Sequence, residues 1–352
     1  MSISIRTNTY VKLLLVVLPV FFMCMTVRAE DKEYNIKELI FEHIEDSYKW
    51  HICKWKEKDI SIHLPVIVKG HESGWHIFMS YKLEDGQSYE GFYIAPEGEF
   101  RHKIVERNGA GEEVRPVDIS ITKTVVGIVV SVILLLVCIM PLAKWYKKGN
   151  IAPPNGFYGA IEFLVLYVQY EIIKPCIGED YKRFSPFLLT AFFFILINNL
   201  IGHIPIFPGG ANVTGNIAIT FFLSFIVFLM INLNTNLHYW KEIFWPNVPR
   251  WLKVPIPLIP IIELWGLIIK PTALMIRLFA NIMAGHSMII GLISLIFISV
   301  AMGPAANASL SVVAIAISVF ISFVELLVAV IQAYVFTLLS AMFIGVSREK
   351  AK

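Results

Sequence analysis

The longest apolar stretch of the chain limits its possible folds more than any other feature. From about Ile256 to Gly345 nearly every residue is apolar, and the one clear break is Gly303-Pro304. Each arm beside that break holds about 42 residues, which as a helix would be roughly 63 Å long at 1.5 Å per residue. That is about twice the thickness of the hydrocarbon core of a bilayer. We therefore expect a membrane hairpin of two long helices, 256–302 and 305–345, tilted by about 60° from the membrane normal.

Three shorter apolar segments precede this hairpin, at 124–142, 187–207 and 215–234. Each is long enough to cross a bilayer as a helix. Charged residues make up only 16% of the chain, compared with about a quarter of a typical soluble domain. The sequence therefore predicts an all-α polytopic membrane protein with five membrane helices.

The basic residues indicate which side of the membrane each loop occupies. Lys144, Lys147 and Lys148 follow the first span directly, so that end is expected in the cytoplasm under the positive-inside rule. Lys182 and Arg183 should share that side. The apolar but acidic segment 157–173 lies between the two basic groups, and a single crossing would separate them. We therefore expect this segment to be an interfacial helix on the cytoplasmic surface.

The first third of the chain has a different character. Residues 1–29 have the basic start, short apolar core and small residues of a secretory signal peptide. Residues 30–118 are polar, and the segments 60–69 and 75–82 predict short β-strands. We expect this part to be extracytoplasmic and the membrane domain to cover 119–352. Six of the nine histidines fall in 30–118, but their spacing matches no metal motif, so surface histidines are the favoured interpretation.

The apolar hairpin carries a few ionisable or polar side chains, and Arg277 is the most costly of them. An arginine at mid-membrane costs about 3 kcal/mol on insertion scales. Folding the hairpin about Gly303-Pro304 brings Arg277 to the depth of Gln332, and His286 to the depth of Glu325. A structural ion pair between Arg277 and Glu325 remains an open alternative. The side chains considered are Glu263, Lys270, Arg277 and His286 on the first arm, and Glu325 and Gln332 on the second.

These side chains differ in what they can do with a proton. His286 and Glu325 can each gain and lose one, and a histidine does so near neutral pH. Arg277 cannot give up its proton, but as a fixed cation it would force a nearby buried acid to ionise and block proton leakage. Because nine residues turn a helix by about 180°, Arg277 and His286 should point to opposite faces. The chain offers no acid on the face of Arg277, which implies a carboxylate on another subunit.

Residues 270–286, KPTALMIRLFANIMAGH, resemble the signature of the a subunit of F-type ATP synthases, and ELLVAVIQAYVFTLL from Glu325 resembles that family's last helix. The resemblance runs from about residue 119 to 346. It implies that Arg277 faces the rotating c-ring and displaces the proton from each ring carboxylate. It also implies that His286 and Glu325 line an inlet half-channel and that Glu263 lies near the cytoplasmic exit. Supporting polar positions along the route would be Asn199, Asn281 and Gln332.

One departure from the best-known bacterial members is that the histidine and the carboxylate are exchanged between the two arms, as in the mitochondrial arrangement. The resemblance implies as partners the c-ring, the b-subunit peripheral stalk and the soluble ATPase head, in a bacterial inner membrane. We find no phosphate-binding loop and expect no cofactor, metal or nucleic acid. Alternatives are sodium coupling, a proton-coupled secondary transporter, which should show paired repeats that we do not find, and a sensor, for which no output domain remains after Gly345.

Overall fold

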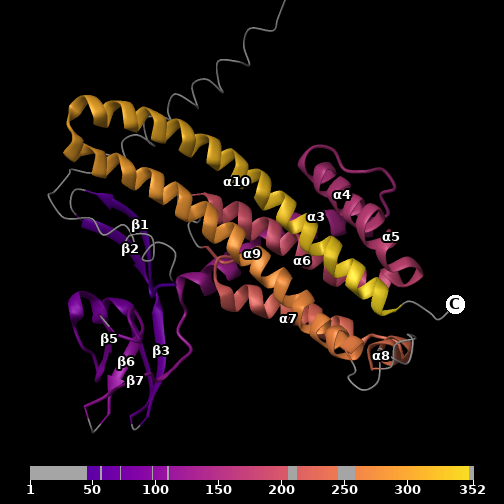
Figure 1. The fold of residues 1–352 in the computed structure, drawn as a ribbon, viewed down its shortest axis with the longest axis horizontal. Helices are drawn as coiled ribbons and strands as arrows, with labels where there is room; N and C mark the ends of the chain where they lie inside the picture. Colours follow the sequence, from indigo (N-terminus) through magenta and orange to yellow (C-terminus); the bar gives the residue numbers. More distant parts are fainter. Residues whose placement is uncertain are drawn as a thin grey trace, which may run out of the picture. The chain divides into compact units, whose positions relative to one another are not determined.

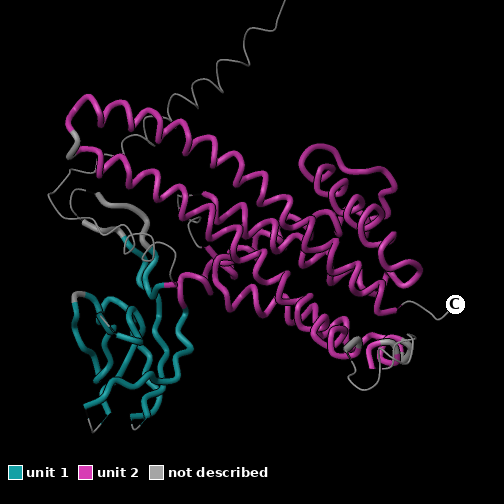
Figure 2. The backbone as a smooth tube through the Cα atoms, viewed as in Figure 1, with its two compact units in different colours: residues 1–39, 47–121 teal, residues 40–46, 122–352 magenta. Residues whose placement is uncertain are grey.

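The computed structural model describes residues 46–55, 58–71, 73–96, 98–108, 111–204, 212–244 and 258–348. The chain divides into two compact units, one running from 47 to 121 in its described part and the other containing residue 46 and everything from 122 onward (Figure 2). The predicted signal peptide at 1–29 lies outside the described residues.

The first unit consists of short antiparallel strands, as the sequence predicts. It has a hairpin β1–β2, a sheet of order β4-β3-β8 and a sheet of order β5-β6-β7. The predicted strand 60–69 is two strands divided at Leu64, whose backbone N–H donates to the carbonyl of Tyr48 instead of to a neighbouring strand. The elements are β1 Lys49–Trp55, β2 Lys58–His63, β3 Pro65–Gly70, β4 Gly74–Met79, η1 Ser80–Gly86, β5 Phe92–Ile94, β6 Ile104–Arg107, β7 Glu113–Val114 and β8 Val117–Asp118.

Alternation of apolar residues builds the core of this unit. Val66 and Val68 of β3 and Phe78 of β4 point to one side of their sheet and are buried, together with Phe92 and Ile104. The predicted strand 75–82 ends at Met79 because the chain turns there into the 3₁₀ helix η1.

The second unit is helical, and its four longest apolar helical segments are long enough to cross a membrane: Lys123–Lys147, Phe157–His203, Pro260–Ile298 and Pro304–Ser347. Ile217–Leu233 is a shorter apolar helix. The fold class predicted from the sequence is confirmed. The elements are α3 Lys123–Lys147, α4 Phe157–Tyr167, the π-helix η2 Val168–Ile173, α5 Lys174–Ile177, η3 Gly178–Asp180, α6 Tyr181–His203, α7 Ile217–Leu233, α8 Leu237–Phe244, α9 Leu258–Ile298, η5 Ser299–Met302 and α10 Pro304–Ser347.

The predicted hairpin is present as α9 and α10, which run side by side in opposite directions (Figure 1). Gly303 joins them with a φ of +101°, a conformation that costs glycine little. Pro304 then occupies the first turn of α10, where its missing N–H leaves no hydrogen bond unmade. Asn307 closes the turn, since its side-chain oxygen accepts from the hydroxyl of Ser299 at 2.6 Å.

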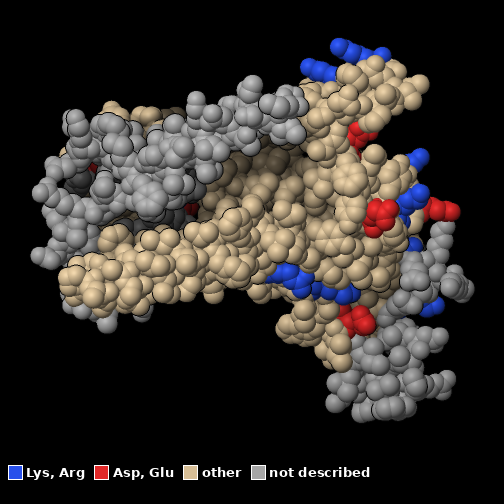
Figure 3. Space-filling view, turned by 90° about the horizontal axis from the view of Figure 1, so that it is seen from above, with Lys and Arg blue, Asp and Glu red and all other residues tan. Residues whose placement is uncertain are grey.

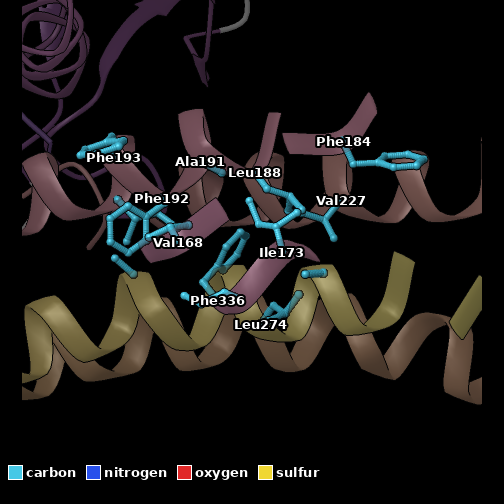
Figure 4. Close-up of a cluster of buried hydrophobic side chains, with 14 of the residues drawn as sticks. Val168, Ile173, Phe184, Leu188, Ala191, Phe192, Phe193, Val227, Leu274 and Phe336 are labelled. Atoms are coloured by element: carbon cyan, nitrogen blue, oxygen red, sulfur yellow. The ribbon is translucent and has the colours of Figure 1, made fainter. Parts of the chain in front are cut away.

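The core of the helical unit lies where α6, η2, α9 and α10 meet (Figure 4). Leu188 and Phe192 of α6 pack there with Leu274 of α9 and Phe336 of α10. The segment predicted as an interfacial helix begins as α4, but its second half is the π-helix η2, and Ile173 there is fully buried in this core. Its apolar residues therefore pack against helices of the same unit.

Charged side chains gather towards one end of the helices on the face shown in Figure 3, and most of the remaining surface there is uncharged. At the C-terminal end of α10, the guanidinium of Arg348 donates to the carboxylate of Asp180 at 2.9 Å and to the backbone carbonyl of Asn234 at 3.0 Å. These contacts tie the start of α6 and the end of α7 to the end of α10.

Candidate ion-pathway site

A small polar cavity lies between α6, the turn before α7, α9 and α10. Its volume is about 20 Å³, close to what one water molecule needs. The cavity is enclosed by apolar helices, so the polar groups on its wall are unusual for a membrane protein interior. The lining side chains that can bind or transfer a proton, or orient a water, are Asn199, His203, Asn281, His286, Glu325 and Gln332.

Glu325 of α10 is the centre of this cavity wall. Its carboxylate lies between two imidazoles, with Oε2 3.3 Å from Nδ1 of His203 and Oε1 3.8 Å from Nδ1 of His286. Only 12% of the Glu325 side chain is exposed. The juxtaposition of His286 and Glu325 expected from the hairpin register is therefore confirmed, and a second histidine from α6 is closer still.

Gly285 makes room for this carboxylate. A Cβ atom at that position would lie 2.7 Å from Oε1 and 2.8 Å from Cδ of Glu325. Any side chain larger than hydrogen would therefore push Glu325 away from its present position between the histidines. The close approach explains why the residue beside His286 on α9 is a glycine.

Two amide side chains are held on the same wall. Asn281 donates from Nδ2 to Oε1 of the buried Gln332 at 2.8 Å, which joins α9 to α10. Asn199 accepts from the hydroxyl of Thr214 at 2.8 Å and donates to the backbone carbonyl of Ala329 at 3.3 Å. Glu325 and Gln332, seven residues apart on α10, line the same cavity.

Arg277 points elsewhere. It is exposed on the outer face of α9, while Leu274 and Leu278 on either side of it are buried in the core. Among the residues that the structure describes, Arg277 makes no hydrogen bond and no ion pair. Arg277 is not among the residues that line the cavity, whereas His286 is. The predicted separation of Arg277 and His286 onto different faces is thus confirmed, and an ion pair between Arg277 and Glu325 is absent from the described part of the chain.

Two other charged residues of α9 stay apart from the cavity. Glu263 is exposed, about four helical turns before Arg277. The ammonium of Lys270 lies 5.8 Å from the centre of the Phe343 ring, a cation–π contact between α9 and α10. The structure therefore does not bring Glu263 together with the other residues predicted for the site.

His203 is the functional candidate that the sequence prediction missed. It ends α6, only four residues after the predicted Asn199. The signal that could have drawn attention to it is a titratable side chain at the end of an apolar helix, but its approach to Glu325 depends on how α6 packs against α10. Asn198, its neighbour in the cavity wall, donates mainly within its own helix, to the carbonyl of Phe194 at 2.8 Å.

The chemistry of these groups is proton binding and transfer. A carboxylate between two imidazoles can accept, hold and release a proton, since each of these side chains exists in a protonated and a deprotonated form. Within the described ranges, no group of three His, Cys, Asp or Glu side chains is placed to hold a metal ion. The arrangement thus consists of a shielded titratable cluster and, on another face of α9, a fixed cation that has no partner among the residues the structure describes.

Most of the chain is similar to proteins of one known family. Residues 125–345 match the family model described as ATP synthase A chain, and residues 39–123 match a domain of unknown function. ATP synthase subunit a of Chloroherpeton thalassium is 38% identical over 241 residues, which are 67% of this chain and 68% of that protein.

Two further relatives show how far the similarity extends. ATP synthase subunit a 2 of Chlorobaculum tepidum is 40% identical over 241 residues, 67% of this chain and 65% of that protein. ATP synthase subunit a 2 of Prosthecochloris aestuarii is 35% identical over 281 residues, 79% of this chain and 81% of that protein. The aligned part spans about two thirds of the first two relatives. The chain is a multi-pass membrane protein that belongs to the ATP synthase subunit a family.

Proposed function

We propose that this chain is the proton-translocating stator subunit of a rotary F-type ATP synthase and that Arg277 acts on carboxylates of a ring subunit that passes α9. The observation that carries the proposal is the outward, unpaired guanidinium of Arg277 among the described residues. A charge of this cost in an apolar helix needs an anionic partner. Glu325, the one carboxylate among the described residues that line the cavity, is already flanked by His203 and His286, so the partner is expected on another protein.

The proposed proton route is supported by the same geometry. Protons would enter through the cavity, where His203, His286 and Glu325 exchange them, and then pass to a ring carboxylate. Asn281 and Gln332 would orient water along this inlet half-channel, and Asn199 would hold its wall. Arg277 would keep each arriving ring carboxylate ionised until it is reprotonated. Glu263 would lie by the separate exit half-channel on the cytoplasmic side.

The side chains of the cavity favour protons over sodium ions. Hard cations prefer several oxygen ligands in one shell, whereas the carboxylate here has an imidazole on each side. Imidazoles add proton-binding capacity but are poor ligands for a hard cation. We therefore prefer proton coupling to the sodium-coupled alternative.

The same proposal includes the assembly and its placement. The chain would join a ring of c subunits, a b-subunit peripheral stalk and the soluble ATPase head, which would carry out all nucleotide chemistry. It would reside in the bacterial inner membrane, with residues 1–29 as a signal peptide and the unit within 30–118 on the outer side. The basic residues beyond α3 and α10 would then lie in the cytoplasm.

Cross-linking tests whether the face of Arg277 meets the ring. Ala280 is exposed one turn beyond Arg277, while Leu278 beside it is fully buried. In membranes of the assembled complex, with the native cysteines replaced, Ala280→Cys should form disulfides with cysteines placed along the outer helix of the ring subunit. Leu278→Cys is the matched control and should form none. If Ala280→Cys forms no cross-link at any ring position, the proposed interface is wrong.

A further inference from the structure

One face of the β4-β3-β8 sheet in the first unit is apolar and exposed. Strand pairing places its outward side chains in three rows, with Lys69 between Trp75 and Val117, and Ile67 opposite Ile77. Pairing continues past β8, because the backbone N–H groups of Ile119 and Ile121 donate to the carbonyls of Ile67 and Pro65. This apolar sheet face is made of Pro65, Ile67, Lys69, Trp75, Ile77, Met79, Val117, Ile119 and Ile121.

The exposure of these side chains is high for residues of their kind. Ile77 is 74% exposed, Ile119 60% and Trp75 56%, while Val66 and Phe78 on the opposite face form the core. An antiparallel sheet with one face in water normally has polar residues on that face. A contiguous apolar patch instead marks a surface that meets another phase or molecule.

The position of this face along the chain indicates its occupant. Ile121, the last residue of the face, is followed two residues later by Lys123, where the 25-residue apolar helix α3 begins. Two extended residues span at most about 7 Å. The chain therefore keeps Ile121 close to the start of α3, the helix expected to enter the bilayer.

The residue that precedes the described part of this unit is also held at the start of α3. The carboxylate of Asp46 accepts from the backbone N–H of Thr124 in the first turn of α3 at 3.0 Å, and the unit begins at the next residue. Tyr48 accepts from the N–H of Leu64, immediately before the Pro65 end of β3. Residues 46 and 122, which the chain joins directly to residues 47 and 121 of this unit, therefore both belong to the part of the chain at the start of α3.

The composition of the face matches the headgroup region of a bilayer. Its single charged side chain is Lys69, whose ammonium lies 5.9 Å from the centre of the Trp75 ring, and it contains no acidic residue. Tryptophan and lysine are typical anchors at the membrane–water boundary, and apolar faces with basic rims bind there without spanning. We propose that the apolar sheet face inserts into the headgroup–acyl boundary of the bilayer into which α3 runs. This monotopic contact does not depend on which ion the helical unit conducts.

Spin-label accessibility tests the proposal on the full chain in its complex. Ile77→Cys and Ile119→Cys would be labelled in a cysteine-replaced background and reconstituted into vesicles of phosphatidylcholine and phosphatidylglycerol. Glu112→Cys, an exposed position outside the face, is the matched control. The ratio of collisions with oxygen, which concentrates in lipid, to collisions with a water-soluble nickel chelate should be several-fold higher at Ile77 and Ile119 than at Glu112.

Each other outcome would overturn the proposal. Equal ratios at all three positions would mean that the face is in water. Labels at Ile77 and Ile119 that are immobile and shielded from both reagents would mean that the face packs against protein, either a second copy or a partner subunit. Since the labels replace exposed side chains, ATP-driven proton pumping by each variant also reports whether the complex has folded and assembled.

Discussion

The imidazole of His203 at the end of α6 lies 3.3 Å from the carboxylate of Glu325 in the middle of α10. The two residues are far apart in sequence, and the contact is shorter than the 3.8 Å between Glu325 and His286. A single carboxylate therefore has two titratable neighbours on two different helices. Because Glu325 is nearly buried, this cluster and not the bulk solvent would determine when it is protonated.

Replacing His203 should slow proton transfer at least as much as replacing His286. We expect His203→Ala to reduce ATP-driven proton pumping in membrane vesicles on the order of a hundredfold, at the lower end of the range typical of a proton-transfer group. The pH profile of pumping should also change, since one titrating neighbour of Glu325 is gone. His71→Ala, at an exposed histidine of the first unit, is the control and should leave both unchanged. Normal pumping and an unaltered profile in His203→Ala would remove His203 from the pathway.

A methyl group at Gly285 should disturb the cluster without unfolding the helix. In Gly285→Ala the new Cβ would lie 2.7 Å from Oε1 of Glu325, so the flexible carboxylate must shift away from His286. We expect normal amounts of assembled complex but a several-fold lower pumping rate. At Gly291, on the same helix, a Cβ would meet nothing within 4 Å, so Gly291→Ala should pump normally. Equal rates in the two variants would contradict the positioning of Glu325 by Gly285.

Gly345 should be essential to stability and not to proton transfer itself. A Cβ there would collide with the backbone carbonyl oxygen of Cys176 in α5, and backbone cannot yield as a side chain can. Overpacking of this kind costs about 1–3 kcal/mol. Thermal unfolding of the purified protein should therefore show a clear loss of stability in Gly345→Ala. Gly266→Ala, where a Cβ has open space, should unfold at the wild-type temperature, and parallel losses in both would argue against tight α5–α10 packing.

Much of the helical unit could be predicted from the sequence because hydrophobic length and the Gly303-Pro304 break are local signals. The pairing of His286 with Glu325 was also predictable, since a hairpin fixes which depths of its two arms meet. His203 was not predictable in the same way, because its approach to Glu325 depends on how α6 packs against α10. No local pattern in the sequence encodes that helix–helix contact.

The burial of Ile173 shows a second limit. Glu162, Gln169 and Glu171 interrupt the segment 157–173 and favour a surface helix when the sequence is considered alone. In the structure the helix widens into the π-helix η2 after Tyr167, and Ile172 and Ile173 turn into the core. The basic residues on either side of this segment indicate that both of its ends lie on one side of the membrane, but they do not reveal a change of helical pitch that turns side chains into the core.

The first unit should lose stability at alkaline pH through Tyr48. Burial of its phenol, together with the hydrogen bond to Asp118 and the charge of that carboxylate, raises the pKa of Tyr48 well above its ordinary value of 10.0. Below that value both folded and unfolded forms keep the proton. As pH rises above it, the unfolded chain ionises first, so folding stability falls. Difference titration of the tyrosine absorbance between wild type and Tyr48→Phe should show a phenol that ionises above the pH of ordinary tyrosines, and a normal midpoint would contradict the burial.

The central claim is that Arg277 is a fixed gate that acts on a carboxylate of another subunit. The most direct measurement is ATP-driven proton pumping in inverted membrane vesicles, together with passive proton leak through the same membranes after the ATPase head is removed. Arg183→Gln is the matched control. Arg183 lies at the exposed start of α6 and donates to the side chain of Asn234 at the end of α7, and a glutamine can still donate there. We predict that Arg277→Ala abolishes coupled pumping while passive leak persists and that Arg183→Gln pumps normally. Coupled pumping retained in Arg277→Ala would contradict the claim.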